Sequence, residues 1–154
     1  MTPQSVQIWM LSTESPFYTS KDTSDKQRLG ALPSKTLACE ALIAVQEKKA
    51  VDVVIMDMQE ISGLADYFIL CSGTSDIQVK AIAESVEKRL KLECRESPWH
   101  IEGAEHRQWV LIDYVDVVVH IFTLERREFY DLERLWSDAP IEKVGEEPVK
   151  MLDP

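Results

Sequence analysis

Residues 65–90 read ADYFILCSGTSDIQVKAIAESVEKRL, and this stretch decides the fold. Its first seven residues form an apolar run with aromatic and branched side chains, which predicts a buried strand over 65–71. Gly73 marks a turn, and Ser75 with Gln78 has the S-x-x-Q spacing of a capping box at the start of a helix. The apolar residues that follow recur at helical spacing and predict one buried helix face. That stripe consists of Val79, Ile82, Ala83, Val86 and Leu90.

The segments on either side add strands and helices to this unit. Strands 109–114 and 116–122 lie so close together that we expect an antiparallel hairpin, because a parallel crossover needs about a dozen residues or more. The order of elements predicts a single α/β domain with a mixed β-sheet and flanking helices. The other expected elements are a helix capped by Ser34 and ending near Lys48 and Lys49, a strand at 51–58, a short strand at 99–102 and a helical region at 125–135.

The two ends of the chain differ from its middle in composition. Residues 1–32 lack sustained periodicity and predict a flexible N-terminal arm, and the proline-containing residues 138–154 predict a flexible acidic tail. The predicted domain therefore spans residues 33–137. Three aromatic side chains of the arm could anchor it to another surface: Trp9, Phe17 and Tyr18.

The acidic charge lies mainly in the predicted domain. The 154 residues include 17 Lys and Arg against 27 Asp and Glu, a net charge of −10, and residues 33–136 hold 19 of the acids and 12 of the bases. This excess of negative charge disfavours direct binding to nucleic acid, which depends on clustered Lys and Arg, and it disfavours docking on an anionic membrane. Three widely spaced cysteines predict neither disulfides nor a zinc site, and they suit the reducing cytoplasm.

Several residue groups could carry chemistry, and each has a structural alternative. Gly73 to Ser75 could hold an anion at a helix start, but a turn with a helix cap is the simpler interpretation. Asp113 and Asp116 could hold Mg²⁺ for nucleotidyl transfer, or they could be turn aspartates. His120 could be a general base, although a hydrogen-bonded structural histidine is favoured. We therefore predict no catalytic residue, cofactor or metal.

Aromatic residues are concentrated in one region. They predict either a crowded core or a sheet face that binds a partner protein, and both interpretations stay open, because Trp and Tyr are enriched at protein interfaces. The region points to a binding module more than to an enzyme. Its members are Trp99, Trp109, Tyr114, Phe122, Phe129, Tyr130 and Trp136.

Several ordered blocks together resemble the ribosomal silencing factor family, also called the RsfS or Iojap family. The resemblance covers residues 35–137. The blocks are ADYFILCSGTS at 65–75, QVKAIA at 78–83, EG at 102–103, WVLIDY at 109–114, DVVVH at 116–120 with Phe122, and RREFYDLERLW at 126–136.

The resemblance implies both a fold and a role. Members have a small α/β domain, distantly similar to nucleotidyltransferases but without their catalytic residues. They bind universal large-subunit protein fourteen on the large ribosomal subunit, at the face that meets the small subunit, and they block subunit joining. The resemblance further implies a cytoplasmic, non-enzymatic translation repressor without cofactors, which often forms a homodimer when free. Rival interpretations are a metal-dependent nucleotidyltransferase using Asp113 and Asp116, and an adaptor for a non-ribosomal complex.

The resemblance also assigns candidate partner contacts to the hairpin. Trp109 and Tyr114 match partner-facing positions, with Phe122 and Asp113 as further candidates. We expect Trp109 to be exposed, so that Trp109→Ala weakens large-subunit binding by ~2 kcal/mol or more with the fold intact. Val115 stands where the family usually has glycine, which predicts a wider or shifted turn, because a β-branched residue avoids positive φ. Ile77 stands where the family often has arginine.

Overall fold

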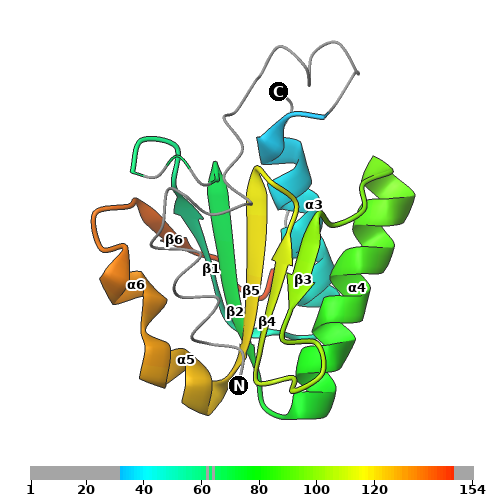
Figure 1. The fold of residues 1–154 in the computed structure, drawn as a ribbon, viewed down its shortest axis with the longest axis vertical. Helices are drawn as coiled ribbons and strands as arrows, with labels where there is room; N and C mark the ends of the chain where they lie inside the picture. The colour runs from blue at the N-terminus through cyan, green and yellow to red at the C-terminus, as the bar shows by residue number, and fades with distance from the viewer. Residues whose placement is uncertain (1–31, 62, 64, 148–154) are drawn as a thin grey trace.

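A computed structural model describes residues 32–61, 63 and 65–147 of the chain, which form a mixed sheet flanked by helices (Figure 1). The six described strands have the order β3-β4-β5-β2-β1-β6; β2 and β5 run parallel, and the other neighbours are antiparallel. The predicted α/β class, mixed sheet and hairpin are therefore confirmed. The strands are β1 (Val51–Asp57), β2 (Tyr67–Gly73), β3 (His100–Glu102), β4 (Trp109–Asp113), β5 (Val117–Thr123) and β6 (Ile141–Lys143). The helices are α3 (Ser34–Glu47), α4 (Asp76–Cys94), α5 (Leu124–Tyr130) and α6 (Leu132–Leu135).

The turn between β2 and α4 is a helix cap, as the sequence predicts. The Ser75 hydroxyl accepts a hydrogen bond from the Gln78 backbone N–H at 3.1 Å, which satisfies one free donor of the first helical turn. The Gln78 carbonyl oxygen Oε1 accepts from the Thr74 backbone N–H at 2.7 Å, one residue earlier than in a capping box. The Gln78 amide also donates to the backbone oxygens of Lys48 and Lys49. One side chain thus joins the start of α4 to the end of α3.

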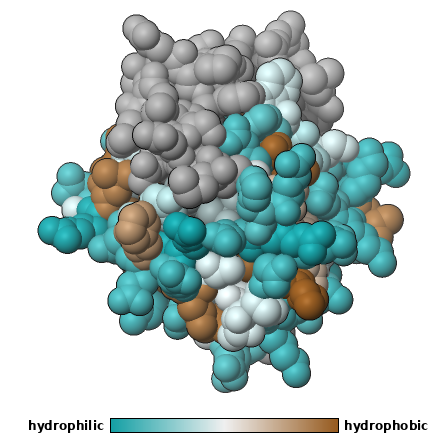
Figure 2. Space-filling view, turned by 60° about the horizontal axis from the view of Figure 1, so that its bottom comes forward, coloured by the Kyte–Doolittle hydropathy of each residue, from teal (hydrophilic) through white to brown (hydrophobic). Residues whose placement is uncertain are grey.

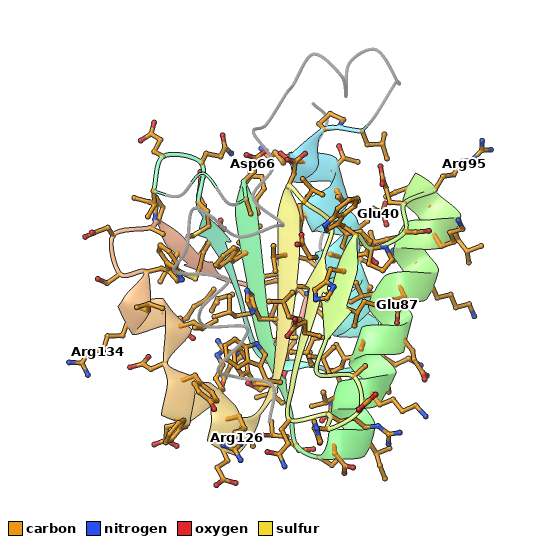
Figure 3. All side chains as sticks on the ribbon, in the orientation of Figure 1. Glu40, Asp66, Glu87, Arg95, Arg126 and Arg134 are labelled. Carbon is orange, nitrogen blue, oxygen red and sulfur yellow. The ribbon has the colours of Figure 1, made fainter. Side chains whose placement is uncertain are left out.

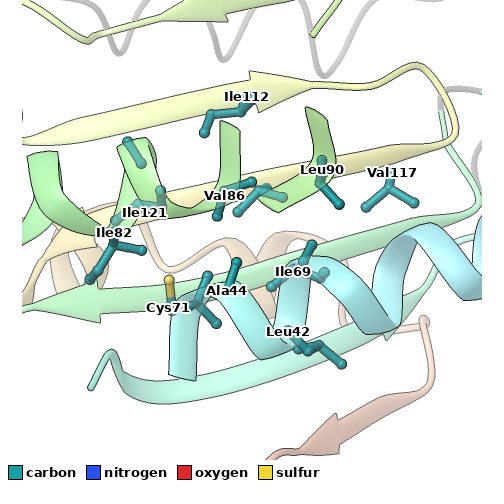
Figure 4. Packing of buried hydrophobic residues seen from close by; sticks show 14 of the residues in the cluster. Leu42, Ala44, Ile69, Cys71, Ile82, Val86, Leu90, Ile112, Val117 and Ile121 are labelled. Carbon is teal, nitrogen blue, oxygen red and sulfur yellow. The ribbon is translucent and has the colours of Figure 1, made fainter. Parts of the chain in front are cut away.

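The sheet has two differently covered faces. Long helices α3 and α4 pack on one face, where branched side chains from both helices meet those of the central strands (Figure 4). We call the opposite side the aromatic face; α5 and α6 lie beside it (Figure 1). Because side chains alternate along a strand, neighbouring residues of β4 and β5 enter different cores. The aromatic face is formed by the buried side chains of Val54, Met56, Phe68, Leu70, Trp109, Leu111, Val118 and Phe122, joined by Leu132 of α6.

Two details of the predicted helices are wrong. Pro33, not Ser34, is the N-cap of α3, and no side chain caps this helix. The fixed φ of proline already favours the extended conformation that a helix entry requires. The helical region at 125–135 is divided into α5 and α6, because Asp131 has a φ of 45° and ends the first helix. Aspartate tolerates this left-handed conformation better than most residues.

The predicted C-terminal boundary is also wrong. Residues 141–143, assigned to a flexible tail at 138–154, form β6 and pair with β1. The Val144 N–H extends this contact to the Val53 oxygen at 2.8 Å, and the Gln46 amide donates to the backbone oxygens of Gly145 and Glu147 at 2.9 and 2.8 Å. A short strand here satisfies backbone groups that β1 would otherwise leave unpaired at a sheet edge. The rest of the tail, 148–154, and the arm at 1–31 lie outside the described residues.

The hairpin between β4 and β5 keeps a tight turn despite Val115. The Tyr114 oxygen accepts from the Asp116 N–H at 2.9 Å, and Val115 between them has a φ of 74°. This is a γ-turn with positive φ at its centre, a rare and strained form. The Asp113 carboxylate supports the turn by accepting from the Val115 N–H at 2.7 Å. The expected widening of the turn is therefore wrong: the turn holds valine in a glycine-like conformation.

Replacing Val115 with glycine should raise the free energy of unfolding by about 1 kcal/mol. Relief of the positive φ recovers on the order of 1–3 kcal/mol, and the greater freedom of glycine in the unfolded chain offsets part of it. Urea unfolding of Val115→Gly and Val115→Ala tests this, because alanine removes the side chain but still disfavours positive φ. A glycine variant no more stable than the alanine variant would show that the turn is not strained.

Candidate functional site

The four predicted contact residues do not all share one face of the sheet. Strand alternation places Trp109 and Asp113 of β4 on the aromatic face, and Phe122 of β5 lies directly opposite Trp109 in the strand register. Tyr114 belongs to the other core, under α3 and α4. The structure therefore brings Trp109, Phe122 and Asp113 to the same side and separates Tyr114 from them.

Trp109 is buried, so the expectation of an exposed tryptophan is wrong. Its indole stacks on the Phe122 ring with centroids 4.7 Å apart, and the Tyr130 ring of α5 lies 4.8 Å away. Trp109 is 1% exposed, and Phe122, Asp113 and Tyr114 are similarly buried, none above 5%. The hairpin sequence could not show this, because Tyr130 reaches Trp109 only after α5 has folded back. Direct partner contact by these four residues stays a prediction.

His120 is a hydrogen-bonded residue of the aromatic face, as the sequence favours. Its Nδ1 accepts a hydrogen bond from the Trp109 Nε1–H at 3.2 Å, and its ring lies edge-on to Phe68. Burial, with a smaller contribution from the charge of Arg127, lowers the pKa of His120 to about 3. The neutral ring therefore accepts at Nδ1 and carries its proton at Nε2. That Nε2–H is buried and has no hydrogen-bond partner within the described part of the chain.

Phe129 differs from Trp109 in its exposure. The sequence left open whether the aromatic residues of this region form a core or a binding face, and the Phe129 side chain is 72% exposed. The Phe129 ring packs edge-on against Tyr130 with centroids 4.9 Å apart, and Tyr130 in turn contacts Trp109. Phe129 is therefore the solvent-accessible end of an aromatic row that starts inside the sheet. The α5 helix ends just beyond this residue, with Asp131 as its C-cap.

Arg127 holds α5 and α6 against the end of β2. Its Nε donates to the Glu133 carboxylate at 3.0 Å, and its Nη1 donates to the Ser72 hydroxyl at 3.1 Å. The Arg127 side chain is 12% exposed, so this partly buried ion pair is shielded from solvent. The labelled side chains of Arg95 and Arg134 instead lie on the outside of the domain (Figure 3). Arg127 thus fixes the helix that carries Phe129 and Tyr130.

Asp113 and Asp116 are structural residues of the hairpin. The Asp113 carboxylate binds the turn N–H of Val115, and the Asp116 backbone oxygen accepts from the N–H groups of Asp66 and Tyr67 at 2.7 and 3.0 Å. Among the described residues, no group of three or more His, Cys, Asp or Glu side chains could hold a metal ion. A cleft of about 1170 Å³ lies at the start of β1, where Lys49, Asp52 and Arg127 line it, away from the four predicted contact residues.

Asp113→Asn should stabilise the protein at neutral pH. Burial raises the pKa of Asp113 from 3.8 to about 6, and the Val115 N–H and the His100 charge oppose this only in part. Because the folded-state pKa is the higher one, the ionised carboxylate costs stability above pH ~6, and this cost is relieved as the pH falls from about 6 towards 4. Asparagine keeps an oxygen for the Val115 N–H.

Urea unfolding at two pH values measures this effect. At pH 7.5 we expect Asp113→Asn to be more stable than the unmodified chain by about 1–2 kcal/mol, and near pH 4.5 the difference should largely vanish. An equal difference at both pH values would mean that the ionisation of Asp113 is not its cause.

Apolar side chains also reach the surface in separate places. Figure 2 shows brown apolar residues divided by a mostly hydrophilic surface. Trp99 before β3 and Leu92 on α4 are 59% and 69% exposed. The Trp99 backbone N–H donates to the backbone oxygen of Asp113 at 2.7 Å, so Trp99 lies beside one of the predicted contacts. Within the described residues, no helix has the length and apolar character needed to cross a membrane.

Comparison with known proteins gives a consistent assignment. The family model described as ribosomal silencing factor during starvation matches residues 31–152. The chain is 47% identical over 100 residues to ribosomal silencing factor RsfS of Halalkalibacterium halodurans, covering 65% of this chain and 85% of the relative. The chain is 42% identical over 107 residues to the RsfS of Bacillus subtilis, and the match covers 70% of this chain and 90% of the relative.

A solved structure agrees with the fold. A crystal structure of a Bacillus halodurans protein matches with a TM-score of 0.63 and 40% identity, covering 71% of this chain and 99% of that one. The matched family region includes the β2–α4 turn, the hairpin and the aromatic row. On these grounds the chain belongs to the ribosomal silencing factor (RsfS) family.

Proposed function

We propose that this chain binds the large ribosomal subunit through universal large-subunit protein fourteen, at the face that meets the small subunit, and so blocks subunit joining. The observation that carries the proposal is the family match across the whole described domain, hairpin included. Relatives are named as ribosomal silencing factors and not as enzymes, which supports a regulator of translation that acts on the ribosome. We further propose that it acts in the cytoplasm without a cofactor and is a homodimer when free.

Charge supports a protein partner for this role. The net charge of −10 repels bare ribosomal RNA, whereas ribosomal proteins are generally basic and attract an acidic surface. The exposed Phe129 lies on a helix with two glutamates and two arginines, so an apolar contact is offered among charged side chains of both signs. An exposed aromatic side chain of this kind suits a partner protein that offers an apolar pocket.

Sedimentation with purified subunits tests the proposal. The tagged protein should move with large subunits in a sucrose gradient, and its addition before mixing should reduce the amount of joined ribosomes. Phe129→Ala should weaken large-subunit binding by about 2 kcal/mol, because an exposed aromatic anchor is lost without loss of core packing. Leu92→Ala, at a comparably exposed position on α4, is the matched control and should bind normally.

One result would contradict the proposed function, and another would contradict only the proposed contact at Phe129. Sedimentation apart from large subunits would remove the ribosomal role and favour an adaptor of another complex. Equal binding by Phe129→Ala and Leu92→Ala would leave the ribosomal role intact and place the contact surface elsewhere.

A further inference from the structure

Three consecutive residues at the tip of the β4–β5 hairpin are each held in an unfavourable state. The Val115 backbone has a φ of 74° at the centre of a γ-turn. The Tyr114 hydroxyl is buried and has no hydrogen-bond partner among the described residues. Burial also raises the pKa of the Asp113 carboxyl to about 6, so its ionised form is disfavoured there. Backbone strain of this kind is concentrated at binding sites and switch regions.

The hairpin tip is fixed on both sides of its turn. The Asp113 backbone oxygen accepts from the Trp99 N–H at 2.7 Å, which ties the end of β4 to the start of β3. The Asp116 backbone oxygen accepts from two successive N–H groups at the start of β2, at 2.7 and 3.0 Å. The freedom of the tip therefore lies in the two residues between these anchors, Tyr114 and Val115.

The Asp113 side chain holds the strained turn closed. Its carboxylate accepts from the Val115 N–H at 2.7 Å, a length typical of a charge-assisted hydrogen bond. This bond fixes the Val115 N–H in the direction that a positive φ requires. When the bond breaks, rotation of the peptide between Tyr114 and Val115 brings Val115 to the negative φ that a β-branched residue prefers.

The Tyr114 side chain adjoins this turn and is only moderately stabilised in its buried position. Its ring belongs to the cluster that the central strands form with α3 and α4. Burial, and to a smaller extent the charge of Glu87 on α4, raises the pKa of its hydroxyl above the ordinary value. The apolar part of the ring favours burial, whereas the hydroxyl gains hydrogen bonds only by reaching water.

We propose that Asp113 and Val115 form a conformational latch: release of the Val115 N–H opens the hairpin tip, moves Tyr114 out of the cluster under α3 and α4, and offers its ring to the ribosomal partner. The open form is a minor state of the free chain, of roughly 0.1–10%. Water replaces the two backbone hydrogen bonds of the turn that opening breaks. Only the role of the partner rests on the proposed function, and the latch itself does not.

Amide hydrogen exchange measures the opening without any ribosome. The Asp116 N–H donates to the Tyr114 oxygen across the γ-turn and exchanges when the tip opens. In the unmodified chain it should exchange at least tenfold faster than the N–H of Ile112 in the middle of β4, after correction for intrinsic rates. Equal exchange at the two positions would overturn the latch, because the tip would then open only when the domain unfolds.

Substitutions at the two latch residues should change this exchange in opposite directions. Val115→Gly removes the strain of the closed turn and should slow exchange at Asp116 about fivefold, the factor that corresponds to about 1 kcal/mol. Asp113→Ala removes the acceptor and should speed it at least fivefold. Val115→Ala keeps the strain, Asp113→Asn keeps an acceptor, and each should stay within about twofold. Changes in the same direction for Val115→Gly and Asp113→Ala would overturn the latch.

Fluorine NMR follows the Tyr114 ring in the same chain. With 3-fluorotyrosine incorporated, relaxation dispersion of the Tyr114 resonance should detect a minor state, and Tyr114→Phe identifies that resonance. The population of the minor state should fall about fivefold in Val115→Gly and less than twofold in Val115→Ala. Opening seen by amide exchange without a minor state of the ring would overturn the proposal, because the turn would then move without Tyr114.

Affinity for purified large subunits tests the role of the partner. Val115→Gly should bind about fivefold more weakly than the unmodified chain, because fewer chains are open, and Val115→Ala should bind within about twofold. Equal affinities of all three chains, together with the shifted ring population, would overturn binding to the open form while leaving the latch in place. If none of the chains binds large subunits, the proposed function fails, and the exchange and fluorine measurements still decide whether the latch exists.

Discussion

Trp109→Ala is expected to lower the free energy of unfolding by about 4 kcal/mol. The indole is 1% exposed and is held between the Phe122 and Tyr130 rings, so its removal leaves a large cavity in the sheet. Truncation of a buried tryptophan to alanine typically costs about 3–5 kcal/mol. The Nδ1 of His120 loses its donor in addition. Chemical denaturation followed by circular dichroism measures the change.

Two further variants separate the loss of buried packing from the mere loss of a tryptophan. Trp109→Phe keeps an aromatic ring and loses the hydrogen bond to His120, so it should cost about half as much or less. Trp99→Ala removes a tryptophan that is 59% exposed and should change stability by less than about 1 kcal/mol. If Trp109→Ala were as mild as Trp99→Ala, the packing described for the aromatic face would be wrong.

This result also changes how binding data on Trp109 must be interpreted. The sequence predicts that Trp109→Ala weakens partner binding and leaves the fold intact. Because the indole is buried, the substitution also destabilises the fold. Loss of large-subunit binding by Trp109→Ala would therefore reflect unfolding as well as contact. Phe129→Ala is the cleaner probe, because its ring is exposed and packs only at the end of the aromatic row.

Gly103→Ala should destabilise the protein by about 3 kcal/mol or more. Gly103 follows β3 with a φ of 81°, and a Cβ atom there would clash with the Trp109 backbone oxygen. A backbone atom of β4 cannot rotate away as a side chain can, so β3 would have to separate from β4. The unfavourable φ alone costs on the order of 1–3 kcal/mol, and the steric conflict adds to it.

Gly145→Ala is the matched control for this substitution. A Cβ atom at position 145 meets no atom within 4 Å, and the change should stay within about 0.5 kcal/mol. Thermal unfolding of the two variants side by side measures the contrast. Similar melting temperatures for both would mean that β3 does not approach β4 as closely as the structure indicates.

Local patterns predicted most of the fold, because they act over a few residues. The cap at Ser75, the stripe along α4 and the β4–β5 hairpin each depend on neighbours within about a turn or a strand pair. The patterns failed where a distant segment decides the outcome. Residues 141–143 become β6 because β1 offers a free edge. These three residues are exposed and lie in a proline-containing segment, so their own sequence does not predict a strand.

In the candidate site, too, neighbouring residues determine which side of the sheet a side chain lies on, and distant segments determine whether it is buried. Trp109, Asp113 and Phe122 lie on one side of the sheet, but alternation along a strand cannot say whether that side is open. Tyr130 closes over Trp109 because Arg127 ties α5 to Ser72 and Glu133, and Phe129 is left outside because α5 ends at Asp131.

The α/β class, the family, the acidic charge and the start of α4 at Ser75 could all be predicted from the sequence alone. These properties follow from composition and from interactions between residues close in the chain. Only the tertiary structure decided which aromatic residues are accessible, where the domain ends and how Val115 fits its turn. Those outcomes depend on packing between segments far apart in the sequence, since burial and strain at one residue are set by whatever the rest of the fold brings against it.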